Sequence, residues 1–201
     1  MTKKKKTPTK ARIIEAALAL FSKNGYGNVT INDICEKSGI TKSTFYYHFE
    51  SKESILDEFI VYSNAYVEEN FNKLIGSSDY VEHLWNFYQV SATPVYDAGV
   101  EISRQLLISN LKKDHNYFTP GAFKEWETEK LLILKAQESG QILNTATPGE
   151  IAESLVFAME GVNLVWCINN GSFDLQEKNR KIFETILMIK PDYSSTEMSQ
   201  K

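Results

Sequence analysis

Residues 39–49 read GITKSTFYYHF, and this stretch combines residue classes that seldom share one short segment. Hydroxyl residues surround a lysine, and a run of aromatic rings with one histidine follows. A buried segment would not carry so many polar groups, and a solvent-exposed loop would not carry so many rings. The composition therefore predicts a helix that packs one face against the protein and presents the other to a partner.

The residues around this stretch predict a helix-turn-helix. Thr30 suits the N-cap of a short helix, and Asp33 stands at the third helical position, where it completes a capping box. Gly39 suits the turn that follows, because glycine adopts the left-handed conformation without steric cost. Thr41 then begins a second helix. Two helices joined by a short turn that contains glycine have the spacing of a helix-turn-helix.

The second helix has two faces with different chemistry. Phe45 and Phe49 lie four residues apart, so they share a face that can pack on Ile34 and Leu18. The lysine and the hydroxyls near its start can reach base edges in the major groove of DNA. The tyrosine and histidine side chains suit phosphate oxygens, which the positive end of the helix dipole also attracts. We therefore expect one face to hold the domain together and the other to meet DNA.

The charge of the chain is unevenly distributed. The net charge is −4, yet residues 1–52 carry ten basic and four acidic residues, a net charge of +6. This leaves a net charge of −10 for residues 53–201. The polarity indicates that only the N-terminal part meets a polyanion. The alternative is that the lysines before Pro8 form a solvated tail that aids solubility.

The rest of the chain shows a helical pattern. Apolar residues recur at helical spacing, and no run alternates with the period of a strand, so we expect an all-α fold. Four helices are expected within residues 9–76. The others are expected near residues 79–93, 96–112, 121–139, 149–170 and 174–190, with Pro94 among the residues that break them.

Residues 30–56, TINDICEKSGITKSTFYYHFESKESIL, follow a helix ending AALALFSKNGY, and together they resemble the DNA-binding domain of the TetR family of bacterial transcriptional regulators. The Thr30 start, the SGIT turn, FYYHF and the following SKE fall where that family has them. Cys35 stands where a small alanine is usual. The resemblance implies a helix-turn-helix DNA-binding domain with a basic arm over residues 1–52. It also implies a larger helical ligand-binding and dimerisation domain over residues 53–201.

The resemblance further implies a homodimeric repressor that binds double-stranded DNA at a palindromic operator and is released by a small apolar or aromatic effector. The residues that it places at or near base edges are Lys42, Ser43, Thr44 and Tyr47. Those that it places at phosphates are Thr30, Thr41, Tyr46, His48 and Lys52. Two alternatives stay open: Tyr46 as a half-buried ring that seals the domain, and His48 as a packing histidine. Whether the protein represses or activates is also open.

The predicted helix near 149–170 includes SLVFAMEGVNLVW and is apolar around most of its circumference, so it must be buried on several sides. The predicted helix near 174–190 offers a second apolar stripe. We expect both to form a four-helix interface about the two-fold axis of a homodimer. The alternative is a monomer with one central buried helix.

Aromatic residues are abundant between residues 62 and 126, where they can form core or line a cavity for an apolar ligand. The helices that usually enclose the pocket in the TetR family place five rings there: Tyr62, Tyr66, Trp85, Tyr88 and Trp126. Glu101 and Arg104 lie three residues apart on one helix. They can orient the polar end of a ligand, or form a surface ion pair of little energetic value.

Signals for other functions are weak. We find no glycine-rich phosphate loop, CxxC or HExxH, and the three histidines are widely separated, so we expect no catalytic activity, metal or cofactor. No long uninterrupted apolar run predicts a membrane-spanning helix. The two cysteines suit buried free thiols in the cytoplasm. The rival hypothesis is an all-α small-molecule carrier or enzyme with a structural helical head, whose binding would not depend on salt as DNA binding does.

Overall fold

The computed structural model describes residues 8–71, 78–113 and 126–191. Its helices are α1 (Thr9–Asn24), α2 (Ile31–Ser38), α3 (Lys42–His48), α4 (Lys52–Phe71), α5 (Tyr80–Ala98), α6 (Val100–Lys113), α7 (Trp126–Glu138), α8 (Pro148–Ile168) and α9 (Leu175–Leu187), with a short 3₁₀ helix, η1 (Tyr26–Asn28), after α1. No strand occurs within these ranges, where one isolated bridge joins Ile142 and Ile189. The all-α prediction is confirmed.

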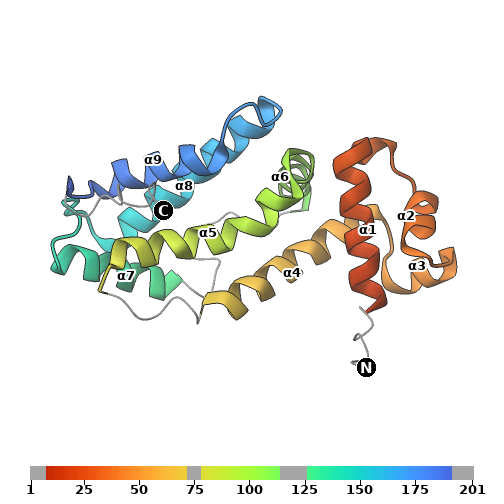
Figure 1. Ribbon diagram of the computed structural model, residues 1–201, viewed down its shortest axis with the longest axis horizontal. Coiled ribbons are helices and arrows are strands. Elements are labelled where there is room, and N and C mark those ends of the chain that lie inside the picture. The colour runs from red at the N-terminus through yellow and green to blue at the C-terminus, as the bar shows by residue number, and fades with distance from the viewer. Residues whose placement is uncertain (1–7, 72–77, 114–125, 192–201) are drawn as a thin grey trace, which may run out of the picture.

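The molecule is elongated and has two regions (Figure 1). We call residues 9–48, which hold α1, η1, α2 and α3, the head, and residues 80–187, which hold α5 to α9, the body. Helix α4 starts just after the head and runs alongside α5 of the body. Helix α6 lies where the body meets the head and contacts α1, η1 and α4.

The core of the head forms around three large side chains that are fully buried: Phe21 of α1, Ile34 of α2 and Phe45 of α3. Burying an apolar side chain of this size contributes about 1.5–3 kcal/mol, so these contacts hold three short helices that would not be stable alone. The same core includes Ile102 and Leu106 of α6. The head is therefore packed directly against the body.

Helix α5 corrects one sequence-based prediction. We expected Pro94 to end a helix and the next helix to begin near residue 96, but α5 continues through Pro94 to Ala98. Proline removes one backbone hydrogen bond, and a long helix packed against α4 and α7 tolerates that loss. The helix ends instead at Gly99, which has φ of 85°.

Helix α8 has one buried and one exposed side. Ile151, Ala152, Leu155 and Cys167 are buried, and the helix packs against α6, α7 and α9. By length and composition α8 could also cross a membrane, which the sequence analysis did not predict. Its contacts with three helices are those of a core helix in a helical domain. Cys167, like Cys35, is a buried free thiol, as predicted.

Candidate nucleic-acid interface

The turn before α3 is held by local hydrogen bonds. The Thr30 backbone N–H donates to Asp33 Oδ2 at 2.8 Å, and the Asp33 N–H donates to Thr30 Oγ1 at 3.3 Å, which is the predicted capping box. The Thr30 N–H and the Thr30 hydroxyl both donate to the Asp33 carboxylate, and they hold its pKa below the usual value. Gly39 adopts φ of 67° at the end of α2, and Thr41 Oγ1 accepts from the Thr44 N–H at 3.1 Å. The angle between α2 and α3 is thus set by capping residues.

A long-range contact supports the same turn. The guanidinium of Arg12, on α1, donates from Nη2 to the carbonyl oxygen of Ser38, the last residue of α2. A cation at a helix C-terminus satisfies a free carbonyl and complements the helix dipole. Arg12 therefore positions the end of α2 and, through it, α3. Sequence reasoning had no signal for this contact because the two residues are 26 positions apart.

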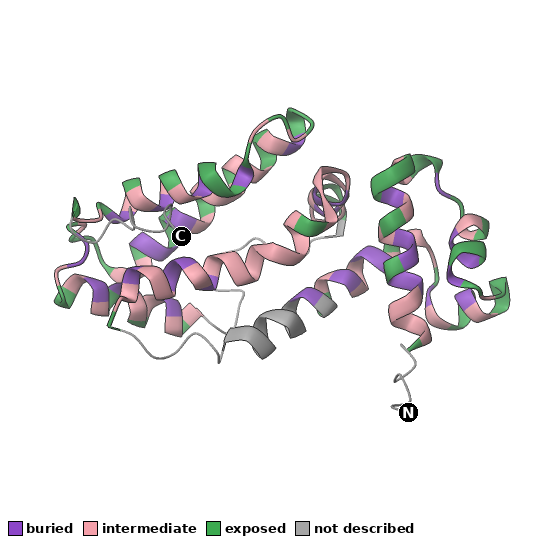
Figure 2. Ribbon diagram, in the orientation of Figure 1, coloured by how far each residue is buried: buried purple, intermediate pink, exposed green. Residues whose placement is uncertain are grey.

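Helix α3 divides into the two predicted faces. Phe45 and Phe49 are buried, whereas Tyr46 and Tyr47 are 55% and 85% exposed. Lys42 and Ser43 are exposed, and Thr44 and His48 are of intermediate exposure. Figure 2 shows exposed residues at the outer end of the head, where α3 lies. The polar side of α3 therefore holds all six residues predicted for it, and its other side, with Phe45 and Phe49, packs in the core of the head. The six residues are Lys42, Ser43, Thr44, Tyr46, Tyr47 and His48.

Tyr46 and His48 also contact neighbouring rings. The Tyr46 ring meets the Phe45 ring edge-on at a centroid distance of 5.5 Å, and Tyr47 meets His48 edge-on at 5.0 Å. Tyr46 is thus supported on one side by the core of the head while more than half of it faces solvent. Edge-on contacts of this kind restrict an exposed ring without burying it.

Lys52, predicted as a phosphate contact, is engaged inside the protein. Its Nζ donates to the carbonyl oxygens of Tyr26 at 2.9 Å and Val29 at 2.6 Å, and it lies 4.6 Å from the centroid of the Tyr26 ring. The ammonium therefore joins the η1 loop to the start of α4. An ammonium has three donors, so one stays available for a further acceptor.

A polar chain connects the head to the body. The Tyr26 N–H donates to Glu101 Oε1 at 3.1 Å, and Glu101 forms an ion pair with Arg104 at 2.8 Å. Arg104 also donates to the Cys167 carbonyl oxygen at 2.9 Å and to Asn170 Oδ1 at 2.6 Å, at the end of α8. Of the two alternatives for this pair, the ion pair is present. It links η1, α6 and α8, a role that the i,i+3 spacing of the pair did not predict.

Three of the five rings predicted to line a pocket, those of Trp85, Tyr88 and Trp126, pack in the core of the body. Trp85 packs on Phe183 with centroids 5.2 Å apart, and Trp126 contacts the same cluster. The Tyr88 hydroxyl donates to the carboxyl group of Glu129, which is 4% exposed. The side chains of Tyr62 and Tyr66, on α4, lie outside the described residues.

Two carboxyl groups in the body have unusual surroundings. Burial raises the pKa of Glu129 to about 7, and burial likewise raises the pKa of Glu160, on α8, to about 7. Oxygen Oε2 of Glu160 has no hydrogen-bond partner in the described part of the chain. Helical periodicity did not distinguish these two acids from the solvent-exposed ones around them.

Comparisons with known proteins agree with this geometry. The family model described as bacterial regulatory proteins, tetR family, matches residues 13–59. The chain is 21% identical over 214 residues to the probable acrEF/envCD operon repressor of Escherichia coli K12, and the match covers 98% of this chain and 94% of that protein.

Two further relatives match different shares of the chain. The biofilm operon icaADBC negative transcriptional regulator IcaR of Staphylococcus aureus Newman is 40% identical over 68 residues, which cover 32% of this chain and 37% of IcaR. The structure of the Thermus thermophilus repressor FadR in complex with lauroyl-CoA superposes with a TM-score of 0.56 at 21% identity, covering 89% of this chain and 93% of that one.

Proposed function

Because the chain belongs to the TetR family of bacterial regulatory proteins, a family of DNA-binding transcriptional regulators, we propose that it is a homodimeric repressor of a palindromic operator. A small apolar or aromatic effector releases it. The observation that carries the proposal is the exposed face of α3. Tyr46 and Tyr47 are aromatic residues held at the surface beside Lys42 and hydroxyl residues, and more than half of each side chain is exposed.

The proposed contacts with bases come from the start and the centre of α3. Lys42, Ser43, Thr44 and Tyr47 are assigned to base edges or to positions next to them. Lys42 and Ser43 stand in the first turn, where a recognition helix meets the major groove. A lysine there can donate to guanine oxygen and nitrogen, and the short hydroxyls can pair with several base edges.

The proposed contacts with phosphates surround that group. They are Thr30, Thr41, Tyr46, His48 and Lys52. Thr41 Oγ1 already accepts a backbone hydrogen bond, so its hydroxyl would donate its proton to a phosphate oxygen. The Thr30 hydroxyl donates to Asp33 Oδ2 at 2.7 Å, so it would exchange that acceptor for a phosphate oxygen. Lys52 would use its third donor and would keep its two carbonyl contacts. That arrangement would tie the position of the η1 loop to DNA binding.

The proposed dimer interface is formed by α8 and α9. Phe157, Leu164, Val165 and Ile168 are all exposed and recur at helical spacing along one side of α8. A soluble chain seldom leaves such a stripe uncovered, and a second copy covers it on a two-fold axis. The exposed stripe argues against the alternative of a monomer with a central buried helix. Paired heads would meet half-sites about 34–36 Å apart, or a multiple of that distance.

The proposed effector binds in the body, among rings such as Trp85, Tyr88 and Trp126. A ligand that changes the packing of α5 to α8 also moves α6, because α6 contacts both α5 and α8. The hydrogen bond from Tyr26 to Glu101 then carries that movement to the η1 loop of the head. Release from the operator follows when the two heads no longer fit both half-sites.

The test is selection of binding sites from a pool of random DNA duplexes with the purified protein at near-physiological salt. Recovery of one palindrome, with affinity that falls steeply as salt rises, is expected for a dimeric operator binder. Recovery of no sequence above background, both as purified and after refolding to strip a bound effector, would contradict the proposal. A carrier or an enzyme with a structural head predicts that second result.

A further inference from the structure

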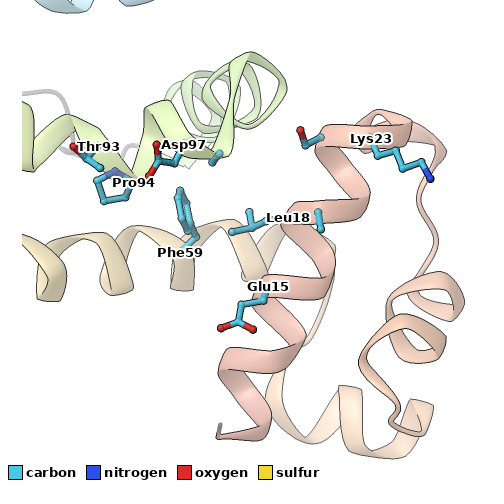
Figure 3. A pocket seen from close by; sticks show the side chains of 10 residues that line it. Glu15, Leu18, Lys23, Phe59, Thr93, Pro94 and Asp97 are labelled. Carbon is cyan, nitrogen blue, oxygen red and sulfur yellow. The ribbon is translucent and has the colours of Figure 1, made fainter. Parts of the chain in front are cut away.

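A cleft of about 540 Å³ lies where the head meets the body. Its walls come from α1 of the head, α4 and the last turns of α5. Figure 3 shows Glu15 and Leu18 on α1, Phe59 on α4 and Pro94 and Asp97 on α5 around this space. The cleft is separate from the aromatic cluster of the body, because Trp85, Tyr88 and Trp126 do not line it.

The lining has an apolar floor and acidic walls. Phe59, which is 4% exposed, borders the cleft with a small part of its side chain, and Leu18 and Pro94 extend the apolar surface. Glu15 and Asp97 are exposed carboxylates on opposite walls. Neither has an ion-pair partner in the part of the chain that the structure describes. Lys23 stands at the rim, and Figure 3 shows its side chain extending away from Phe59 and Asp97.

We propose that this cleft is a binding site for small organic cations. Its volume lies in the range of pockets for small ligands, about 300–1,000 Å³. An apolar body would pack on Leu18, Phe59 and Pro94. An ammonium group would lie between the carboxylates of Glu15 and Asp97. A neutral ligand would leave both carboxylates unpaired, and an anionic ligand would be repelled by them.

Occupancy of the cleft would affect the angle between head and body. A ligand that contacts α1 and α5 together favours one relative position of these helices. Its binding is then linked to DNA binding, and the linkage is reciprocal. This second part rests on the proposed DNA-binding function, whereas the binding site itself does not.

The first experiment titrates the full-length protein with three probes that share a phenylbutyl body: 4-phenylbutylamine, 4-phenylbutan-1-ol and 4-phenylbutanoate. Amide chemical shifts in NMR spectra locate each binding site. We expect shift changes at residues 15–23 and 93–99, with the amine binding at least about threefold more tightly than the alcohol, because it gains two exposed ion pairs. Equal binding of the three probes, or shift changes confined to other residues, would overturn the proposal.

Charge-removing variants sharpen this test. Asp97→Asn and Glu15→Gln keep the shape of the lining, and each should weaken binding of the amine by about two- to fivefold and leave the alcohol unchanged. Glu138→Gln is the matched control, because it removes the same charge from an exposed residue at the far end of α7. An equal loss in the control would mean that the amine responds to net charge and not to the cleft.

The second experiment measures the affinity for the selected operator with and without saturating amine. We expect the dissociation constant to change in the wild-type protein and to stay constant in the Glu15→Gln, Asp97→Asn double variant. A constant value in the wild-type protein would overturn the linkage. If no operator is recovered, the proposed function fails, and the NMR titration still decides whether the cleft binds cations.

Discussion

Helices α3 and α8 both expose large side chains, but the two surfaces have opposite chemistry. On α3 the exposed rings are Tyr46 and Tyr47, which carry hydroxyl groups and stand next to a lysine and short hydroxyl residues. On α8 the exposed stripe includes Phe157, 59% exposed, and Ile168, 69% exposed, which have no polar atoms in their side chains. The first surface suits a charged, hydrated partner, and the second suits a dry one.

The comparison shows why exposure alone does not identify a partner. DNA offers phosphates and base edges, so its binding surface needs hydrogen-bond donors and tolerates water. A second copy of the chain offers the same apolar stripe, so that interface gains free energy by excluding water. Each surface can therefore be tested by a substitution that spoils only its own chemistry.

The largest effect is expected on α8. Phe157→Arg would place two unpaired charges in the centre of the proposed dimer interface, at a cost of several kcal/mol. We expect monomers in sedimentation experiments and a loss of operator affinity of about a hundredfold or more, because one head then binds one half-site. Leu131→Arg, which charges an exposed apolar residue of α7, is the control. If the Phe157→Arg variant still sediments as a dimer, the dimer interface does not include this part of α8.

The buried acids of the body, Glu129 and Glu160, lie outside both surfaces and should dominate the pH dependence of the free energy of unfolding. Burial raises the pKa of Glu129 to about 7 from 4.5, so the folded state holds a proton that the unfolded state releases. The free energy of unfolding should fall as pH rises from about 4.5 to about 7 and level off above that range. Glu129→Gln should remove the contribution of Glu129 to this fall, leave that of Glu160, and stabilise the protein at pH 8 by about 2–3 kcal/mol.

Denaturant unfolding at pH 5 and pH 8 measures that effect. Glu138→Gln, at an exposed position of α7, is the matched control and should leave the pH profile unchanged. A fall with pH that persists in full in the Glu129 variant would assign the titration to other groups.

On α3, Lys42→Ala should weaken operator binding by about 1–3 kcal/mol if the lysine contacts a base. Binding to random DNA should change less. Fluorescence titrations on both duplexes measure the two losses, with Lys112→Ala at the exposed end of α6 as the control. Equal losses on operator and random DNA would reassign Lys42 to a phosphate.

The smallest effect concerns one hydroxyl group on α3. Tyr46→Phe should weaken binding to all DNA by about 0.5–1.5 kcal/mol, the value of one hydrogen bond, without a change in melting temperature. The ring and its edge-on contact with Phe45 remain in this variant. A lower melting temperature with unchanged affinity would instead support the alternative in which Tyr46 seals the head.

The helix-turn-helix was predictable because its signals are local. Thr30, Asp33, Gly39 and Thr41 act within four residues of their own positions, and all of them do what their spacing predicts. Helical periodicity likewise predicts that Phe45 is buried while Tyr46 and Tyr47 next to it are exposed. The end of α5 was harder to predict, because packing against α4 and α7 outweighs the local effect of Pro94.

The contacts between distant parts of the chain could not be predicted. Lys52 donates to the carbonyl oxygens of Tyr26 and Val29, which lie 26 and 23 positions away. The Tyr26 N–H donates to Glu101, which lies 75 positions away and pairs with Arg104. A lone lysine or an i,i+3 charge pair gives no signal of such partners in the sequence. The same holds for Glu129, whose burial depends on how α5 and α7 pack.

By itself the sequence determined the helices, their caps, the two faces of α3 and the resemblance of residues 30–56 to a DNA-binding domain, because each depends on residues close together in the chain. The tertiary structure alone decided which charges are paired, which acids are buried and where α1, α4 and α5 leave a cleft between head and body. Those outcomes depend on the relative positions of helices. Many weak contacts summed over the whole fold set these positions, and no single motif encodes them.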